Sequence, residues 1–194
     1  MKRRLALFIS GTGGNALNLL RACREGRVGA EPVLAVCSNP AAAGIARLEA
    51  QGLPVSVLDP KAFPDAAAHS RACFEAVEAR NADLIALCGW LKHLDVPPPW
   101  EGRILNIHPA LLPGFGGPGM YGMRVHRAVL AAGVPESGAT IHLVDALYDH
   151  GAILAQARVP VLPGDTPETL QARVYQAEMA LYPEALARYI QNAP

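Results

Sequence analysis

Short apolar runs alternate with amphipathic segments of helical length along most of the chain, and this alternation limits the possible folds more than any other feature. Five apolar runs have the length of strands: 5–10, 33–37, 55–58, 84–88 and 103–107. Apolar residues recur at helical spacing in four segments: 16–24, 42–51, 65–80 and 123–132. Strands separated by helices are joined by right-handed crossovers into a parallel sheet covered on both faces. The sequence therefore predicts an α/β fold with a single doubly wound, mostly parallel sheet.

The last third of the chain has a different pattern. The apolar runs 139–144 and 153–161 are separated by only a turn, which predicts an antiparallel strand pair. A helix start follows at 165–168, where a capping side chain, a proline and an acid stand in order. We expect this helix to run to Tyr182, with Pro183 either kinking it or beginning a new segment. With 194 residues and 51% hydrophobic content, the chain suits one domain spanning residues 1–194.

The balance of charge limits the kinds of partner. Lys and Arg number 17, as do Asp and Glu, so no basic excess indicates nucleic-acid binding. A small phosphorylated ligand stays possible, because a few N–H groups at a helix start can hold one phosphate. The composition leaves both a monomer and a homodimer open.

The cysteines and the apolar runs bear on the compartment. The four cysteines show neither a C-x-x-C motif nor zinc spacing with histidines, so we expect buried, reduced thiols and no metal. The run at 5–9 is too short for a secretory signal, and no segment reaches the length of a membrane span. A cytoplasmic enzyme without membrane partners is the expectation.

A polar pair stands at the end of the fifth apolar run, in Asn106-Ile107-His108-Pro109. Residues two apart in a strand point to the same side, so Asn106 and His108 can converge on one small volume. An amide N–H can stabilise a tetrahedral oxyanion, and an imidazole can move the proton that an attacking amine loses. Asp149, in the turn between the last two apolar runs, is the best carboxylate to orient the imidazole. An ordinary loop-bonding role for Asn106 and His108 is the alternative.

The segment after this pair is irregular. Pro109 and Pro113 force a non-regular backbone, and a cis peptide is plausible at Leu112–Pro113. A glycine-rich stretch at 114–122 then follows. Long loops within compact domains are usually functional or disordered, and the neighbouring Asn-x-His favours a functional loop.

A glycine-rich loop joins the first apolar run to the first helix. Its residues are Ser10, Gly11, Thr12, Gly13, Gly14 and Asn15. It matches neither a Walker A motif nor the full dinucleotide fingerprint, so a plain tight turn is one interpretation. The other is an anion site at a helix start, with Asn15 as a possible cap. Ligands of such sheets bind beyond the carboxyl ends of the strands, which would bring this loop, the turn at 89–94 and the Asn106/His108 pair to one rim.

Three motifs of the chain resemble those of the folate-dependent phosphoribosylglycinamide formyltransferases. In chain order they are Ser10-Gly11-Thr12-Gly13-Gly14-Asn15, Asn106-Ile107-His108-Pro109-x-Leu111-Leu112-Pro113 and His142-x6-Asp149-x-Gly151. The resemblance covers nearly the whole chain. It implies a Rossmann-like formyltransferase fold and transfer of the formyl group of 10-formyltetrahydrofolate, the co-substrate, to the primary amine of glycinamide ribonucleotide in de novo purine biosynthesis. No metal takes part in that chemistry.

The resemblance also implies roles for individual residues. Asn106, His108 and Asp149 match the catalytic trio. The loop from Gly11 to Asn15 would hold the substrate phosphate, and Glu178 would contact the ribose hydroxyls. The folate would bind along the turn formed by Gly89, Trp90, Leu91, Lys92 and Leu94.

Several positions depart from the family pattern or leave a role open. Lys92 stands where relatives often have an arginine near the folate tail, and lysine lacks the bidentate fork. Tyr175 stands where some relatives place a polar side chain on the phosphate, which leaves that contact open. His126 and His142 fall inside family motifs, where packing or loop ordering competes with a chemical role.

Three other functions share parts of these motifs. A formyltetrahydrofolate hydrolase uses the same Asn-His-Asp core but adds an N-terminal regulatory domain, whereas the first strand is expected at the start of this chain. Formyl transfer to initiator tRNA would need a basic C-terminal domain. A non-catalytic nucleotide-binding module would explain the fold and the glycine loop, but not the three polar residues in register.

Overall fold

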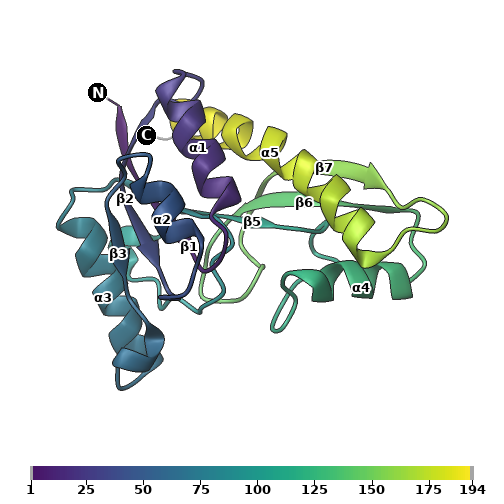
Figure 1. The fold of residues 1–194 in the computed structure, drawn as a ribbon, viewed down its shortest axis with the longest axis horizontal. Coiled ribbons are helices and arrows are strands. Elements are labelled where there is room, and N and C mark those ends of the chain that lie inside the picture. The colour runs from purple at the N-terminus through teal and green to yellow at the C-terminus, as the bar shows by residue number, and fades with distance from the viewer. Residues whose placement is uncertain (1, 193–194) are drawn as a thin grey trace.

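The computed structural model describes residues 2–192 and contains one seven-stranded sheet with the order β3-β2-β1-β4-β5-β6-β7 (Figure 1). The strands are β1 (Arg3–Ile9), β2 (Ala30–Cys37), β3 (Val55–Val57), β4 (Leu84–Leu87), β5 (Ile104–His108), β6 (Glu136–Leu143) and β7 (Ile153–Pro160). The α-helices are α1 (Gly14–Arg24), α2 (Gly44–Glu49), α3 (Ala66–Glu78), α4 (Met123–Ala131) and α5 (Pro167–Asn192). Two short 3-10 helices are η1 (Pro60–Ala62) and η2 (Pro98–Trp100).

The sheet is parallel from β3 to β5 and antiparallel beyond. β6 runs antiparallel to β5, and β7 runs antiparallel to β6. The doubly wound, mostly parallel sheet with a C-terminal antiparallel pair is therefore confirmed. The antiparallel order has a consequence for function, because it places β6 directly beside the strand that carries Asn106 and His108.

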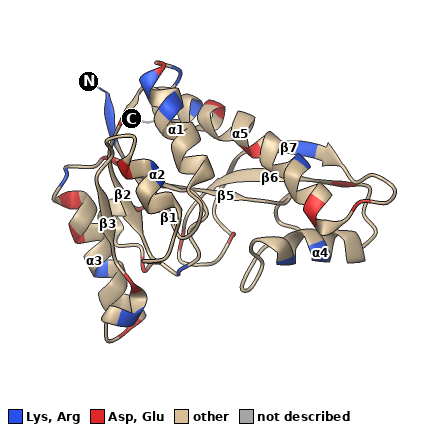
Figure 2. Cartoon of the chain, viewed as in Figure 1, with Lys and Arg blue, Asp and Glu red and all other residues tan. Residues whose placement is uncertain are grey.

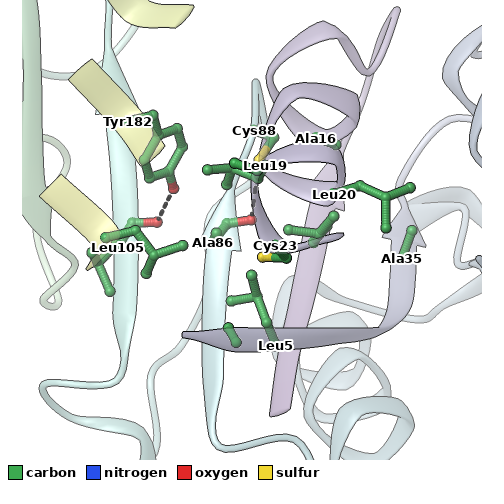
Figure 3. Packing of buried hydrophobic residues seen from close by; sticks show 14 of the residues in the cluster. Leu5, Ala16, Leu19, Leu20, Cys23, Ala35, Ala86, Cys88, Leu105 and Tyr182 are labelled. Carbon is green, nitrogen blue, oxygen red and sulfur yellow. Dashed lines mark hydrogen bonds between the residues drawn. The ribbon is translucent and has the colours of Figure 1, made fainter. Parts of the chain in front are cut away.

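Both faces of the sheet are buried, as an α/β sheet requires. Residues Leu5 to Ile9 of β1 are all fully buried, and they alternate between two cores. Leu5, Leu7 and Ile9 pack with α1 and α5, while Ala6 and Phe8 pack with α3 on the opposite face. Figure 3 shows the first of these cores, where leucines of α1 lie over Leu5 and Ala86. This period-2 alternation explains why an all-apolar run folds as a central strand.

Helix α5 does not end or restart at Pro183 but continues to Asn192, so the expected boundary at Tyr182 is wrong. Proline lacks the N–H that would bond the carbonyl four residues earlier, which is Met179. That carbonyl instead accepts a hydrogen bond of 2.7 Å from Asn18 Nδ2 of α1. Tyr182 is fully buried, and its hydroxyl donates to the carbonyl of Leu105 (Figure 3) and also lies 3.2 Å from the carbonyl of Leu87. Tertiary contacts thus compensate for the proline and fasten α5 to the sheet.

Charged residues are dispersed around the outside of the fold. Figure 2 shows Lys and Arg interspersed with Asp and Glu along the outer helices. Among the described residues, no helix is long and apolar enough to cross a membrane.

Candidate functional site

The carboxyl ends of β1, β4 and β5 open into a cavity of about 570 Å³, a size typical of small-molecule sites. Its wall includes the loop 11–15, the turn 89–94, the end of β5, the loop 117–122, residues between 142 and 149, and side chains of α4 and α5. The glycine loop, the turn and the Asn106/His108 pair therefore meet at one rim, as the sequence predicted. Parallel strands bring this about, since their carboxyl ends share one edge of the sheet.

Asn106, His108 and Asp149 lie together in this wall. Asn106 Nδ2 lies 3.4 Å from Asp149 Oδ1, and His108 Nδ1 lies 3.4 Å from Asp149 Oδ2. His108 is buried, and its Nε2 donates to the carbonyl of Phe115 at 2.8 Å. Both ring nitrogens thus face oxygen acceptors. The two side chains of β5 point to the same side, and the β6–β7 connection supplies the carboxylate that joins them.

The backbone of the β6–β7 connection sets the position of Asp149. Its φ is 54°, in the left-handed region that Asp tolerates better than most residues. Its Oδ2 also accepts a 3.0 Å bond from the Gly117 N–H. Burial alone would raise the pKa of Asp149, but the neighbouring imidazoles of His108 and His142 and the Gly117 N–H outweigh it and hold the pKa well below the ordinary value. The side chain is therefore a carboxylate at neutral pH.

His142 belongs to this cluster, although the sequence left its role open. It lies opposite Asn106 in the β5–β6 register, and its Nε2 accepts from Asn106 Nδ2 at 3.0 Å. Its Nδ1 is 2.8 Å from its neighbour's carbonyl, that of Leu143, which can only accept. His142 therefore carries its proton on Nδ1 when neutral and orients the Asn106 amide. The motif spacing alone could not reveal this contact, because it depends on strand pairing.

No metal arrangement accompanies the cluster. Within residues 2–192, no group of three or more His, Cys, Asp or Glu side chains is placed to hold an ion. All four cysteines are free and buried.

The glycine loop enters α1 through Gly13, which has φ 70° and so requires a residue without Cβ strain. Gly44 of α2 packs against it, and a Cβ there would lie 2.7 Å from the Gly11 carbonyl oxygen. No side chain caps the first turn of α1. The first N–H groups of a helix lack partners within it. At α1 these groups belong to residues that border the cavity, such as Gly14 and Asn15.

Asn15 does not cap α1, so the expectation that its side chain is the helix cap is wrong. It lies inside the helix, and its Nδ2 donates to Glu178 Oε2 of α5 at 2.7 Å. Its Oδ1 is buried and has no hydrogen-bond partner. Glu178 is only 7% exposed and borders the cavity, so it does not lie on a solvated helix face. Burial raises the pKa of Glu178 to about 7, although Asn15 and His108 oppose the shift.

The turn after β4 forms another wall of the cavity. The Leu91 N–H donates to Ser10 Oγ at 3.0 Å, which ties this turn to the glycine loop. Leu91 and Lys92 are exposed at the cavity, while Leu94 is buried. The Trp90 ring packs against Phe8 with centroids 4.9 Å apart, so its side chain is largely core.

The loop after β5 lines a further side of the cavity. The Leu112–Pro113 peptide is cis, as expected. His126 of α4 borders the cavity and is buried, with no partner for Nδ1. Burial, and then the neighbouring His108, lower the pKa of His126. The sequence indicated neither the Phe115 carbonyl nor the Gly117 N–H, because backbone groups leave no residue signature.

Comparison with known proteins shows to which family the chain belongs. Residues 3–186 match the formyl transferase family. A chloroplastic phosphoribosylglycinamide formyltransferase of Arabidopsis thaliana is 41% identical over 95% of the chain, which spans 64% of the plant protein. The phosphoribosylglycinamide formyltransferase of Bacillus subtilis is 33% identical, with 97% of this chain and 95% of that protein aligned.

A solved structure agrees with these sequence matches. Glycinamide ribonucleotide transformylase 1 from Symbiobacterium toebii superposes with a TM-score of 0.92 at 36% identity, covering 98% of this chain and 88% of that one. The fold and the extent of the alignments thus agree over nearly all of the sequence. The chain belongs to the formyl transferase family.

Proposed function

We propose that this chain transfers the formyl group of 10-formyltetrahydrofolate to the primary amine of glycinamide ribonucleotide, a step of de novo purine biosynthesis. One observation carries the proposal: Asn106, His108 and Asp149 contact one another in the wall of a cavity that the helix-start loop also borders. Groups for acyl chemistry and groups for holding a phosphate therefore face the same volume. The similarity to phosphoribosylglycinamide formyltransferases supports the choice of substrates.

In this mechanism the substrate amine attacks the formyl carbon and the carbonyl oxygen becomes an oxyanion. Asn106 Nδ2 is the donor for that oxygen. It already holds two bonds, of 3.0 Å to His142 and 3.4 Å to Asp149. The longer bond is the weaker, so the oxyanion replaces Asp149 as the acceptor of that hydrogen, while the bond to His142 keeps the amide in place.

Proton transfer completes the exchange. The amine loses a proton to His108, whose Nε2 must first leave the carbonyl of Phe115. The folate N10 gains a proton as its bond to the formyl carbon breaks, which yields tetrahydrofolate and the formylated amine. Asp149 stays ionised, because its pKa is held well below the ordinary range. It therefore stabilises a protonated His108 rather than carrying the proton itself.

The substrates occupy opposite sides of this cluster. The phosphate lies at the start of α1, against the N–H groups after Gly13. Glu178, held by Asn15 Nδ2, accepts hydrogen bonds from ribose hydroxyls. The folate lies along the turn of Gly89, Trp90, Leu91, Lys92 and Leu94, where Lys92 is a point charge for a tail carboxylate.

An assay for tetrahydrofolate, followed by absorbance, tests the reaction. Product that forms only when glycinamide ribonucleotide is added supports the transferase. Product that forms equally without the ribonucleotide would identify a hydrolase of formyltetrahydrofolate. No product in either case would leave a nucleotide-binding module as the better interpretation.

The pH dependence of ribonucleotide binding tests the role of Glu178. Because burial raises the pKa of Glu178 to about 7, the carboxylate acceptor is lost as the pH falls through that value. The ribonucleotide Kd should rise about tenfold between about pH 8 and about pH 6, as expected for loss of one ionised group.

Glu178→Gln is the matched control for this prediction, since it has the shape of the protonated acid. Calorimetric titrations of Glu178→Gln should show only the weaker pH dependence of the phosphate, whose own second pKa is about 6. A wild-type Kd that does not change over this interval would contradict the assigned contact.

We also propose a cytoplasmic location. The four free, buried cysteines fit a reducing compartment. Fractionation of the source cells would test the location.

A further inference from the structure

Ser10 opens the glycine-rich motif but, unlike Gly11 to Asn15, does not border the cavity. The residue is only 7% exposed, and its hydroxyl makes two contacts inside the protein. Its Oγ lies 2.7 Å from Ser38 Oγ and accepts a hydrogen bond of 3.0 Å from the Leu91 N–H. A hydroxyl can accept from one group and still share a hydrogen with another, so both contacts are satisfied together. The Ser10 hydroxyl is therefore engaged by the protein rather than placed to touch a substrate.

The bond to Leu91 stands where the strand pairing ends. β1 and β4 pair in parallel, and the last backbone bond between them runs from the Cys88 N–H to the Phe8 carbonyl at 2.7 Å. Within the described part of the chain, residues 89–96 form no hydrogen bond with another backbone group. Side chains of other elements must therefore hold the backbone of this turn.

Two serine hydroxyls hold it, one near each end. Ser10 accepts from the Leu91 N–H, and Ser70 of α3 accepts from the Asp95 N–H at 3.1 Å. The two bonds differ in what they join. Leu91 borders the cavity and is tied to the glycine loop, whereas Asp95 does not border the cavity and is tied to a helix on the opposite face of the sheet. The bond from Ser10 thus connects two walls of the candidate site.

We propose that Ser10 is a positioning residue, whose hydroxyl fixes the folate turn relative to the glycine loop and so sets the distance between the formyl group and the amine. This inference rests on the proposed function, which places the two substrates on these two segments. A misplacement of about 1 Å between reacting groups can cost about 10²-fold in rate, so one bond between the subsites matters for turnover. Ser38, which is 3% exposed, orients the Ser10 hydroxyl from the end of β2.

Amide hydrogen exchange of the ligand-free protein, followed residue by residue by NMR, tests the tie directly. In Ser10→Ala the Leu91 amide should exchange about tenfold faster or more, because it has lost its acceptor. The Asp95 amide, held by Ser70, should keep its wild-type rate. Ser70→Ala is the matched control and should show the reverse pattern. Unchanged exchange at Leu91 in a folded Ser10→Ala protein would overturn the tie.

Steady-state kinetics tests whether the tie positions the folate. Ser10→Ala should lower kcat/KM for 10-formyltetrahydrofolate about 10- to 100-fold and leave the KM of the ribonucleotide within about twofold of wild type. Ser70→Ala should stay close to wild type, because Asp95 does not border the cavity. Equal losses in the two variants, or a Ser10→Ala effect confined to the melting temperature, would mean that Ser10 only stabilises the fold.

A double-mutant cycle shows whether Ser38 acts through Ser10. Ser38→Ala alone should lower the folate kcat/KM less than Ser10→Ala does, since Ser10 can still accept from the Leu91 N–H. In a Ser10→Ala background, Ser38→Ala should cost no further activity, because residues in one hydrogen-bond network are not additive. Multiplicative losses would overturn this role of Ser38.

The outcomes also separate this inference from the proposed reaction. Calorimetric titration with an unreactive 10-formylfolate analogue should show a raised Kd in Ser10→Ala and a wild-type Kd in Ser70→Ala. Faster Leu91 exchange together with that raised Kd would support the positioning role even if no formyl transfer were detected. A wild-type analogue Kd and a wild-type folate kcat/KM in Ser10→Ala would overturn the role while leaving the reaction itself intact.

Discussion

Asn106→Ala should lower turnover by about 10² to 10³-fold, the usual cost of one oxyanion donor, and His108→Ala by about 10² to 10⁴-fold, the range for a general acid or base. Both side chains act mainly on the transition state in the proposed mechanism, so the KM values of the two substrates should change little. Steady-state rates with both substrates saturating measure the effect.

His150→Ala is the matched control for the histidine variant. His150 is also on the β6–β7 connection, but it is exposed and bonds Asp145 at 2.9 Å. Its removal should leave turnover close to that of the wild type. Near-normal turnover in folded Asn106→Ala or His108→Ala would show that the residue is not catalytic.

Asp149→Asn should lower turnover by about 10² to 10⁴-fold, because His108 loses the charge that stabilises its protonated form. Asparagine suits this test, since it tolerates the left-handed backbone at φ 54° and can still accept the Gly117 N–H. A loss of activity would therefore come from the missing charge rather than from a displaced loop. Asp59→Asn, which can keep the cap of η1 at a position that does not border the cavity, controls for a general effect of Asp-to-Asn exchange.

A second variant shows whether Asp149 acts through His108. In a His108→Ala background, Asp149→Asn should cost little further activity, because residues that work as a unit are not additive. Independent, multiplicative losses would argue that Asp149 contacts the substrate by itself.

The architecture followed from local patterns in the sequence. Runs such as 84–88 are apolar throughout because the strands are buried on both faces, and the helical spacing between them requires crossovers. The shared direction of Asn106 and His108 follows from the period of a strand. The prolines after them predicted an irregular turn, and the cis bond at Leu112–Pro113 is present. These features depend on residues close in sequence, so the sequence alone determined them.

Contacts between distant segments were decided by the tertiary structure. The β5–β6 register places His142 against Asn106, and the packing of α5 on α1 buries Glu178 against Asn15. The same packing lets Asn18 bond the carbonyl that Pro183 leaves free, so the helix continues beyond Tyr182, where local sequence predicted its end. Propensity and periodicity describe one segment at a time, whereas hydrogen-bond partners and burial depend on which segments meet. The sequence by itself therefore determined the sheet and the two polar residues of β5, and only the folded chain decided how their partners surround them.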